Sequence, residues 1–428
     1  MSSQSASKHK RHVLRNGVTV LEIDSPSTQA ATVLVLVKTG SKHETRKESG
    51  LSHFLEHMFF KGTKKRPTPI AVSEPLDLVG GVFNAFTSEE CTGYFAKVDR
   101  AHIKLAIDWV SDIFLHSTIP VREVEKEKGV IIEEQNMRRD APMMHIESMW
   151  QRLLYGDQPA GWDIAGTKES IQAMSRNDLT SYMKEQYVAS NTVVCIAGNL
   201  GRSGAAAQVK RAFRAVPSSS PRAKPEVVEF QTDPNVLSEY RKTDQTHSAL
   251  GVRGYNLFHK DRFAQDLLAV ILGGMMSSRL FIEIRERLGL AYYVSTQSDS
   301  NPDTGFVMTQ VGVRNANAVK AVSAILKEYR RVAIRGVTAP ELRKAKENTK
   351  GKLALALESS DRKATAFGLQ QLLEGRTYSL QEMYDMIDSV RRSDIHRVAS
   401  DVFRSENLNL AVLGPFKDSS EFQSILKL

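Results

Sequence analysis

The chain contains an internal repeat, which limits the folds it can adopt. NTVVCIAGN begins at Asn191 and NLNLAVLGP begins at Asn407, while DLTSYM begins at Asp178 and DIHRVA begins at Asp394. Both pairs have the same offset of 216 positions (407 − 191 and 394 − 178). Each copy predicts a helix that leads into a buried strand ending at glycine. Two matches at one offset indicate a duplicated unit of about half the chain.

Strand and helix patterns alternate within each half, and the 428 residues are too many for one core. The stretch GGVFNAFTSEECTGYFAKV predicts a hairpin, so the sheets are not purely parallel. We expect an α+β fold of two homologous α/β-sandwich domains, each a mostly antiparallel or mixed sheet with helices on one face. The predicted limits are a disordered basic arm at 1–12, a first domain at 13–215, a Pro/Ser-rich linker at 216–226 and a second domain at 227–428.

Composition excludes several classes of protein. The net charge of +9 comes from short, scattered basic clusters without a nucleic-acid-binding motif, so we expect no nucleic-acid partner. No apolar run approaches the roughly 18 residues that cross a membrane, and the leader lacks the apolar core of a secretion signal. Two cysteines provide no disulfide framework. We expect a cytoplasmic protein without a membrane partner, or one of the mitochondrial matrix if the chain is eukaryotic.

The segment GLSHFLEHMFFKGT, residues 50–63, predicts a short helix with an apolar stripe and a second, polar face. His53, Glu56 and His57 share this polar face. Two imidazoles four residues apart can bind one Zn²⁺, and the glutamate between them can take a proton from a bound water. Ser49 or Ser52 is expected to cap the helix start. Without further evidence, such a histidine pair is more often a coincidence of surface residues.

Catalytic zinc usually has three protein ligands, so a second segment must contribute one. Residues 121–140, VREVEKEKGVIIEEQNMRRD, predict a helix on which Glu127, Ile131 and Glu134 share a face. We expect Glu134 to be the third ligand, with Glu133 as the alternative. Glu127, two turns earlier on the same face, is expected to hydrogen-bond a ligand imidazole.

These segments resemble the pitrilysin/insulinase family of inverted-motif (HxxEH) zinc metallopeptidases. The resemblance is strongest to the branch of mitochondrial processing peptidase beta subunits and their bacterial homologues, and it extends from Arg15 to Pro415. It implies a zinc-dependent endopeptidase with one Zn²⁺ per chain and Glu56 as the base that activates water. It also places Glu134 at the metal and Glu127 at the family's accessory glutamate.

The resemblance further implies how a peptide substrate is held. Asn84, Ala85 and Phe86 correspond to an edge strand that pairs with the extended substrate. Arg285 and Tyr292 correspond to a pair that binds substrate and the developing oxyanion, although the sequence alone indicates a surface helix charge and a strand residue. Arg287 competes with Arg285, but its spacing to the tyrosine does not match.

The presence of both features on one chain predicts a homodimer in which each Arg285 and Tyr292 face the partner's zinc. A heterodimer with a related subunit is the alternative. The competing function is a non-catalytic structural subunit, like the core proteins of respiratory complex III. Intact residues at the motif favour the peptidase. Presequence-like segments and short unfolded peptides both remain open as substrates.

Overall fold

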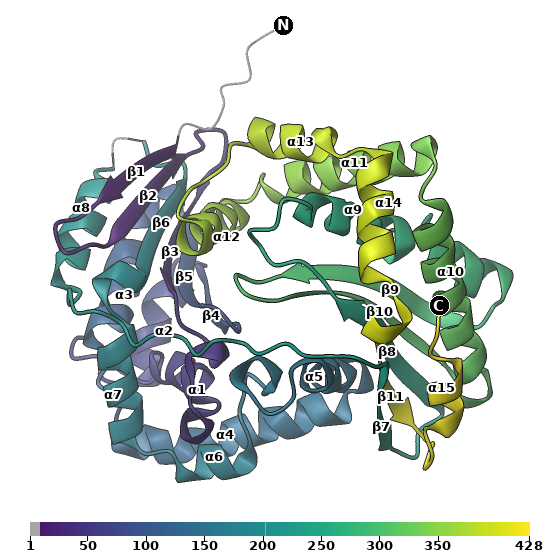
Figure 1. Ribbon diagram of the computed structural model, residues 1–428. Helices are drawn as coiled ribbons and strands as arrows, with labels where there is room; N and C mark the ends of the chain where they lie inside the picture. Colours follow the sequence, from purple (N-terminus) through teal and green to yellow (C-terminus); the bar gives the residue numbers. More distant parts are fainter. Residues whose placement is uncertain (1–8, 202) are drawn as a thin grey trace, which may run out of the picture. The chain divides into compact units, whose positions relative to one another are not determined.

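The computed structural model describes residues 9–201 and 203–428, which form two compact units (Figure 1). The first unit comprises residues up to Gln135, Asp163–Pro225 and Leu353–Glu382. The second comprises Asn136–Trp162, Glu226–Lys352 and Met383–Leu428. Within the described residues, no helix is both long and apolar enough to cross a membrane.

The first unit is built on a six-stranded mixed sheet in the order β1-β2-β6-β3-β5-β4. Strands β2 and β6 are parallel and all other neighbours are antiparallel. β4 therefore forms one edge of the sheet. The strands are β1 (His9–Val13), β2 (Thr19–Asp24), β3 (Ala30–Val37), β4 (Val82–Thr87), β5 (Thr92–Asp99) and β6 (Thr192–Gly198).

The second unit repeats this plan with five strands in the order β7-β11-β8-β10-β9. Its one parallel pair is β7 with β11, just as β2 pairs with β6. The repeated sequences form matching central strands and the helices before them, which confirms the duplication. The strands are β7 (Asn235–Tyr240), β8 (Gln245–Arg253), β9 (Ala291–Ser300), β10 (Gly305–Arg314) and β11 (Leu408–Gly414).

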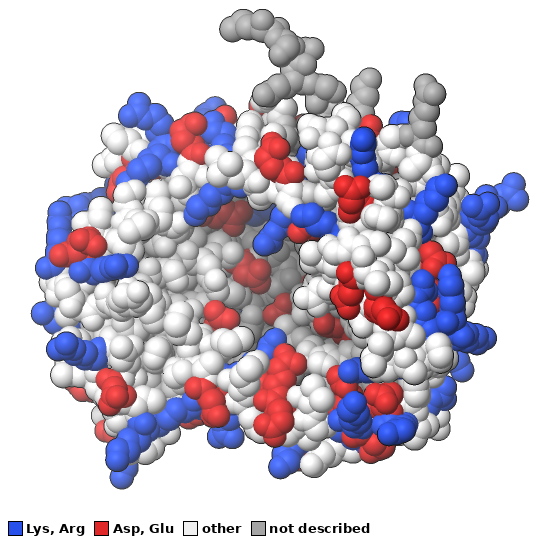
Figure 2. All heavy atoms as spheres, turned by 180° about the vertical axis from the view of Figure 1, so that it is seen from behind, with Lys and Arg blue, Asp and Glu red and all other residues white. Residues whose placement is uncertain are grey.

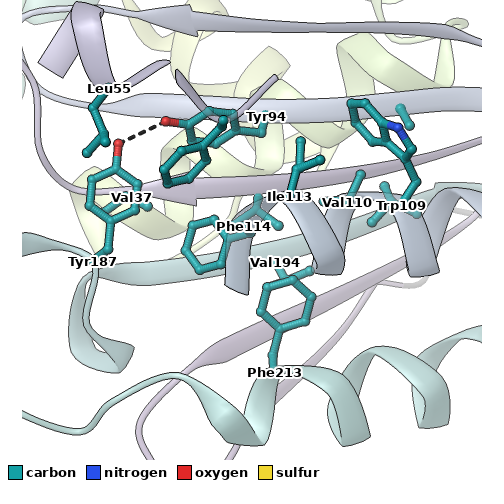
Figure 3. Close-up of a cluster of buried hydrophobic side chains, with 14 of the residues drawn as sticks. Val37, Leu55, Tyr94, Trp109, Val110, Ile113, Phe114, Tyr187, Val194 and Phe213 are labelled. Atoms are coloured by element: carbon teal, nitrogen blue, oxygen red, sulfur yellow. Dashed lines mark hydrogen bonds between the residues drawn. The ribbon is translucent and has the colours of Figure 1, made fainter. Parts of the chain in front are cut away.

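Each sheet has a main helical layer on one face, and the predicted α+β fold with two sheet-containing domains is confirmed. In the first unit this layer encloses an aromatic core, part of which Figure 3 shows. The unit contains α1 (Leu51–Met58), α2 (Pro69–Asp77), α3 (Ile103–His116), most of α4 (Val121–Asp140), α6 (Lys168–Ala173), α7 (Arg176–Gln186), α8 (Ala205–Ala212) and α12 (Ser360–Leu369). The second contains α5 (Pro142–Tyr155), α9 (Arg262–Gly273), α10 (Ala318–Arg335), most of α11 (Ala339–Ala356) and of α13 (Leu380–Ser389), α14 (Arg392–Val402) and α15 (Ser420–Ile425).

Each half of the sequence contributes one helix to the unit that contains the sheet of the other half. α12, from the second half, packs on β3 and β6 of the first sheet, where Gly368 permits close approach. Thr32 on β3 and Ser360 at the start of α12 hydrogen-bond through their hydroxyls at 2.8 Å. α5, from the first half, packs on β8 and β11 of the second sheet. The predicted limits 13–215 and 227–428 omit this exchange, because periodicity identifies a helix but not the sheet that it covers.

The prediction for the N-terminal arm needs correction, whereas the predicted linker has no regular structure but makes several contacts. Of the arm expected at 1–12, residues 1–8 lie outside the described part, but residues 9–12 belong to β1 and pair with β2. Their polar side chains match an edge strand, which is exposed along one side. The segment 216–226 has no regular structure, yet salt bridges hold it to the first unit. Arg222 bonds both carboxylate oxygens of Glu48, and Lys224 bonds Glu90.

Charged side chains are mixed on the surface seen in Figure 2. Lys and Arg residues lie between Asp and Glu residues, and neither sign covers a continuous area of the face in view. The net charge of +9 is therefore not concentrated in one extended basic patch on this face.

Candidate metal centre

Helix α1 is fixed by its start and by its apolar face. Gly50 precedes it with a φ of 91°, in the left-handed region that glycine adopts most readily. The Glu44 carboxylate accepts the backbone N–H groups of Gly50 and Ser52 at 2.8 and 2.7 Å. The expected serine cap is therefore wrong: the Ser52 hydroxyl instead pairs with the hydroxyl of Tyr182 at 2.9 Å. Burial outweighs these hydrogen bonds and raises the pKa of Glu44 to about 8.

The apolar stripe of α1 is fully inside the core. Its four members pack among aromatic side chains that include Tyr94, Phe114 and Tyr187. In Figure 3, Leu55 lies beside Tyr94 and Tyr187, whose hydroxyls hydrogen-bond at 2.9 Å. Because this face is buried, the opposite face with the histidines has one fixed orientation. The stripe consists of Leu51, Phe54, Leu55 and Met58.

Three candidate metal ligands lie together. The Nε2 atoms of His53 and His57 are 3.3 Å apart, and Glu134 Oε2 lies 3.5 and 3.6 Å from them. Two atoms that both bind a tetrahedral zinc at about 2.0–2.1 Å are separated by about 3.4 Å. The three distances therefore fit one zinc ion with an open fourth position. Glu133, the alternative ligand, is not part of this cluster.

Glu127 orients the His57 ring through Nδ1, the ring nitrogen that is not part of the ligand cluster. Its Oε1 lies 2.9 Å from His57 Nδ1, and Lys61 Nζ lies 2.7 Å from its Oε2. Since Nδ1–H donates to this carboxylate, the lone pair of Nε2 can face a metal. Burial would raise the pKa of Glu127, but His57 and Lys61 outweigh it and lower that pKa.

The surroundings of His57 are strongly negative. Burial alone would lower its pKa, but hydrogen bonds with Glu127 and Glu134, together with the charges of Glu127 and Glu56, raise it to about 9. Such an environment favours a cation at the imidazole. Donor types, spacing and charge thus all fit a divalent metal, and zinc suits two imidazoles with one carboxylate.

Glu56 has a direct partner on the edge strand. Thr87, the last residue of β4, donates its hydroxyl to Glu56 Oε2 at 2.5 Å. This length is typical of a hydroxyl that donates to an ionised carboxylate. The contact connects the central glutamate of the motif to β4.

The residues expected to contact substrate lie on β4, an edge strand of the first sheet. The Asn84 amide oxygen accepts the backbone N–H of Ala85 at 2.9 Å. The ring of Phe86 covers Gly93 of β5, where an added Cβ would be 2.5 Å from the ring. Phe86 thus packs on the sheet, and its backbone remains on the edge strand.

Arg285 and Tyr292 belong to the second unit and lie together there. Arg285 sits in a π-helical turn, Phe281–Arg287, and Tyr292 lies near the start of β9. The guanidinium carbon is 4.8 Å from the centre of the Phe281 ring and 5.5 Å from that of Tyr292, within range of cation–π attraction. Tyr292 is 81% exposed. Arg287 instead pairs with Glu283.

Comparison with known protein families shows the family to which the chain belongs. Residues 19–168 match the family model described as insulinase (peptidase family M16), and residues 173–349 match that of the peptidase M16 inactive domain. The chain belongs to peptidase family M16. The histidine motif and Glu134 lie within the first match, whereas Arg285 and Tyr292 lie within the second.

Similar proteins match nearly the full length of the chain. A Bacillus subtilis protein named uncharacterized zinc protease is 35% identical over 95% of this chain and 98% of its own. A Streptomyces coelicolor protein of the same description is 33% identical over 96% and 90%. The crystal structure of a protease from Helicobacter pylori superposes with a TM-score of 0.88 at 26% identity, covering 96% of this chain and all of that one. A chain of complex III2 from Candida albicans, at 19% identity and a TM-score of 0.82, shares the fold.

The sequence analysis did not predict two side chains of the site, Thr87 and Lys61. Thr87 could have been found from alternation along the strand, which places it on the same face as Ala85. Lys61 follows His57 by four residues, a helical spacing, although it lies beyond the end of α1. Neither belongs to the motif itself, and their contacts with Glu56 and Glu127 depend on how separate elements pack.

Proposed function

We propose that this M16 protein is a zinc-dependent endopeptidase that hydrolyses extended peptides, with one Zn²⁺ held by His53, His57 and Glu134. The spacing of their three donor atoms is the observation that carries the proposal. Two further facts support it: Glu56 lies between the histidines, and full-length relatives are named zinc proteases.

Each residue then has a distinct part in the reaction. A bound zinc supplies a Lewis acid that polarises the scissile carbonyl and lowers the pKa of water. Glu56 takes a proton from the attacking water on its carboxylate and passes it to the leaving amine nitrogen. Glu127 holds the Nδ1–H of His57, so that Nε2 stays unprotonated and correctly oriented.

We further propose that the substrate binds as an added strand on the free edge of β4. Asn84, Ala85 and Phe86 are the proposed contacts, and a peptide that pairs at the Ala85 N–H takes the place of the Asn84 amide oxygen. Such pairing recognises mainly the peptide backbone, so sequence preference is loose. Targeting presequences and short unfolded peptides both meet this requirement.

Arg285 and Tyr292 are proposed to complete the site by binding substrate and the developing oxyanion. Because both features occur on one chain, we propose a homodimer in which each pair serves the partner's zinc. A heterodimer with a related M16 chain is the alternative. We also propose a cytoplasmic location, which cell fractionation tests directly.

The decisive experiment combines metal analysis with peptide hydrolysis. Purified protein is expected to contain about one zinc per chain and to cleave an unstructured fluorogenic peptide, with loss of activity in chelator and recovery on zinc addition. Glu56→Gln should retain zinc and lose at least ~10²-fold in kcat, because the amide cannot take the proton. A zinc-loaded Glu56→Gln with wild-type turnover would refute the assigned base.

The alternative of a non-catalytic structural subunit makes the opposite prediction. Such a protein needs none of His53, Glu56, His57 and Glu134, yet this chain has all four. If the wild-type protein carries stoichiometric zinc but cleaves none of a varied set of unfolded peptides, the structural alternative replaces the peptidase.

A further inference from the structure

Thr87 makes a short hydrogen bond with Glu56, the proposed catalytic base. Its hydroxyl donates to Glu56 Oε2 at 2.5 Å. A glutamate side chain has three rotatable bonds, so a carboxylate without a fixed donor samples several positions. A hydroxyl donor at this distance favours one of these positions.

The position of Thr87 in β4 makes it a rigid donor. Phe83 and Ala85 pack against the core below the strand, and Thr87 follows with the same alternation toward α1. Its backbone pairs with Thr92 at the end of the hairpin with β5. The turn beyond is closed by the Ser88 N–H donating to the Cys91 carbonyl at 2.8 Å. A β-branched side chain on such a strand has few rotamers.

We propose that Thr87 is a positioning residue that aligns the Glu56 carboxylate for proton transfer. Because Thr87 lies on β4, it also ties this alignment to the strand along which the peptide is proposed to bind. The inference rests on the proposed function: it assigns the edge strand a second role, that of orienting the base.

The test removes the hydroxyl while keeping the shape of the side chain. Thr87→Val is expected to lower kcat roughly 10- to 100-fold with KM within about twofold, because small misplacements of a catalytic group have effects of this size. Thr87→Ser restores the donor and should recover most of kcat. Zinc content, measured by elemental analysis, should equal that of the wild type in both variants.

A matched control comes from the same sheet. Thr32→Val removes a buried hydroxyl that pairs with Ser360, away from the proposed catalytic residues, and should leave kcat and KM unchanged. If Thr87→Val does not fold, Thr87→Ala serves as the second variant without a hydroxyl. Thermal unfolding of all variants identifies any general loss of stability.

A double mutant shows whether Thr87 acts through Glu56. In the Glu56→Gln background, Thr87→Val should reduce the residual rate by less than about twofold, because the base is already lost. A full additional 10-fold loss, wild-type kcat in Thr87→Val, or failure of Thr87→Ser to recover would overturn the inference. These outcomes require an active wild-type zinc enzyme. An inactive or zinc-free wild type would instead refute the proposed function itself.

Discussion

At the scale of single residues, helical spacing predicted that two histidines and a glutamate of residues 121–140 meet, with Glu134 expected and Glu133 as the alternative. His53, His57 and Glu134 come from two helices and lie within 4.8 Å of one another through their donor atoms. The cap of α1 could not be predicted in the same way. Glu44 reaches Gly50 and Ser52 through an irregular loop whose path has no period in the sequence.

Substitution of the adjacent glutamates separates the two candidates for the third ligand. Glu134→Gln should lose zinc during dialysis, because a neutral amide binds the ion much more weakly than a carboxylate. Glu133→Gln, the matched control, should keep about one zinc per chain. Elemental analysis checks both. The opposite pattern, with zinc kept in Glu134→Gln and lost in Glu133→Gln, would show that the wrong carboxylate has been assigned.

Glu127→Gln should have an intermediate effect. Its amide can still contact His57 but carries no charge, so zinc affinity is expected to fall by about 10- to 100-fold, the usual range for partners of ligand histidines. Competition with a chromophoric chelator measures this change. If Glu127→Gln binds zinc as tightly as the wild type does, Glu127 does not contribute to metal binding.

At the scale of elements, the Glu44 carboxyl group that caps the start of α1 makes the stability of the fold depend on pH. Its pKa is raised from 4.5 to about 8 in the folded protein, so the folded state binds this proton more tightly than the unfolded state. The contribution of Glu44 to stability is therefore complete below about pH 4.5 and is lost as the pH rises through about 8. The loss amounts to at most roughly 1.4 kcal/mol per pH unit.

Urea unfolding at several pH values tests this sign. Between pH 6 and 9, Glu44→Gln should show a smaller decline in unfolding free energy than the wild type, because the amide does not titrate. Other groups titrate equally in both proteins and cancel in the difference. Parallel pH curves for the two proteins would show that Glu44 is not the group responsible.

The exchanged helices show what the sequence could not predict. Apolar periodicity and the repeat at 216 positions were enough to predict the duplication and two domains that each combine a mixed sheet with helices. They could not show that α12 covers the first sheet and α5 the second, because a helix with one apolar face packs equally well on either sheet. Contacts such as that of Thr32 with Ser360 decide this, and they join residues far apart in the chain.

Gly368 offers a test of the α12 packing. A Cβ there would lie 2.6 Å from Leu36 Cδ1 and 3.0 Å from Cys195 Sγ, and both residues are buried. Gly368→Val should therefore cost roughly 1–3 kcal/mol of unfolding free energy. Gly351 on α11 has no atom within 4 Å of an added Cβ, so Gly351→Val should be nearly neutral. Equal effects in denaturant titrations would contradict close packing of α12.

At the scale of the whole molecule, the proposed homodimer predicts that Arg285 and Tyr292 of one chain serve the zinc site of the other. If they act across a dimer, Glu56→Gln and Arg285→Ala chains should each be nearly inactive alone. Mixed and allowed to exchange, they form heterodimers in which one site has an intact Glu56 from one chain and an intact Arg285 from the other. Its second site carries both substitutions.

Statistical mixing makes half of the dimers heterodimers, and each has one of two sites rebuilt. The mixture should therefore recover about a quarter of the wild-type rate. If Arg285 acts within its own chain, every site retains one substitution and mixing restores nothing. Sedimentation must first show a dimer, and differently labelled subunits must be seen to exchange. With exchange established, an inactive mixture would rule out the shared site, whereas a quarter of the activity requires it.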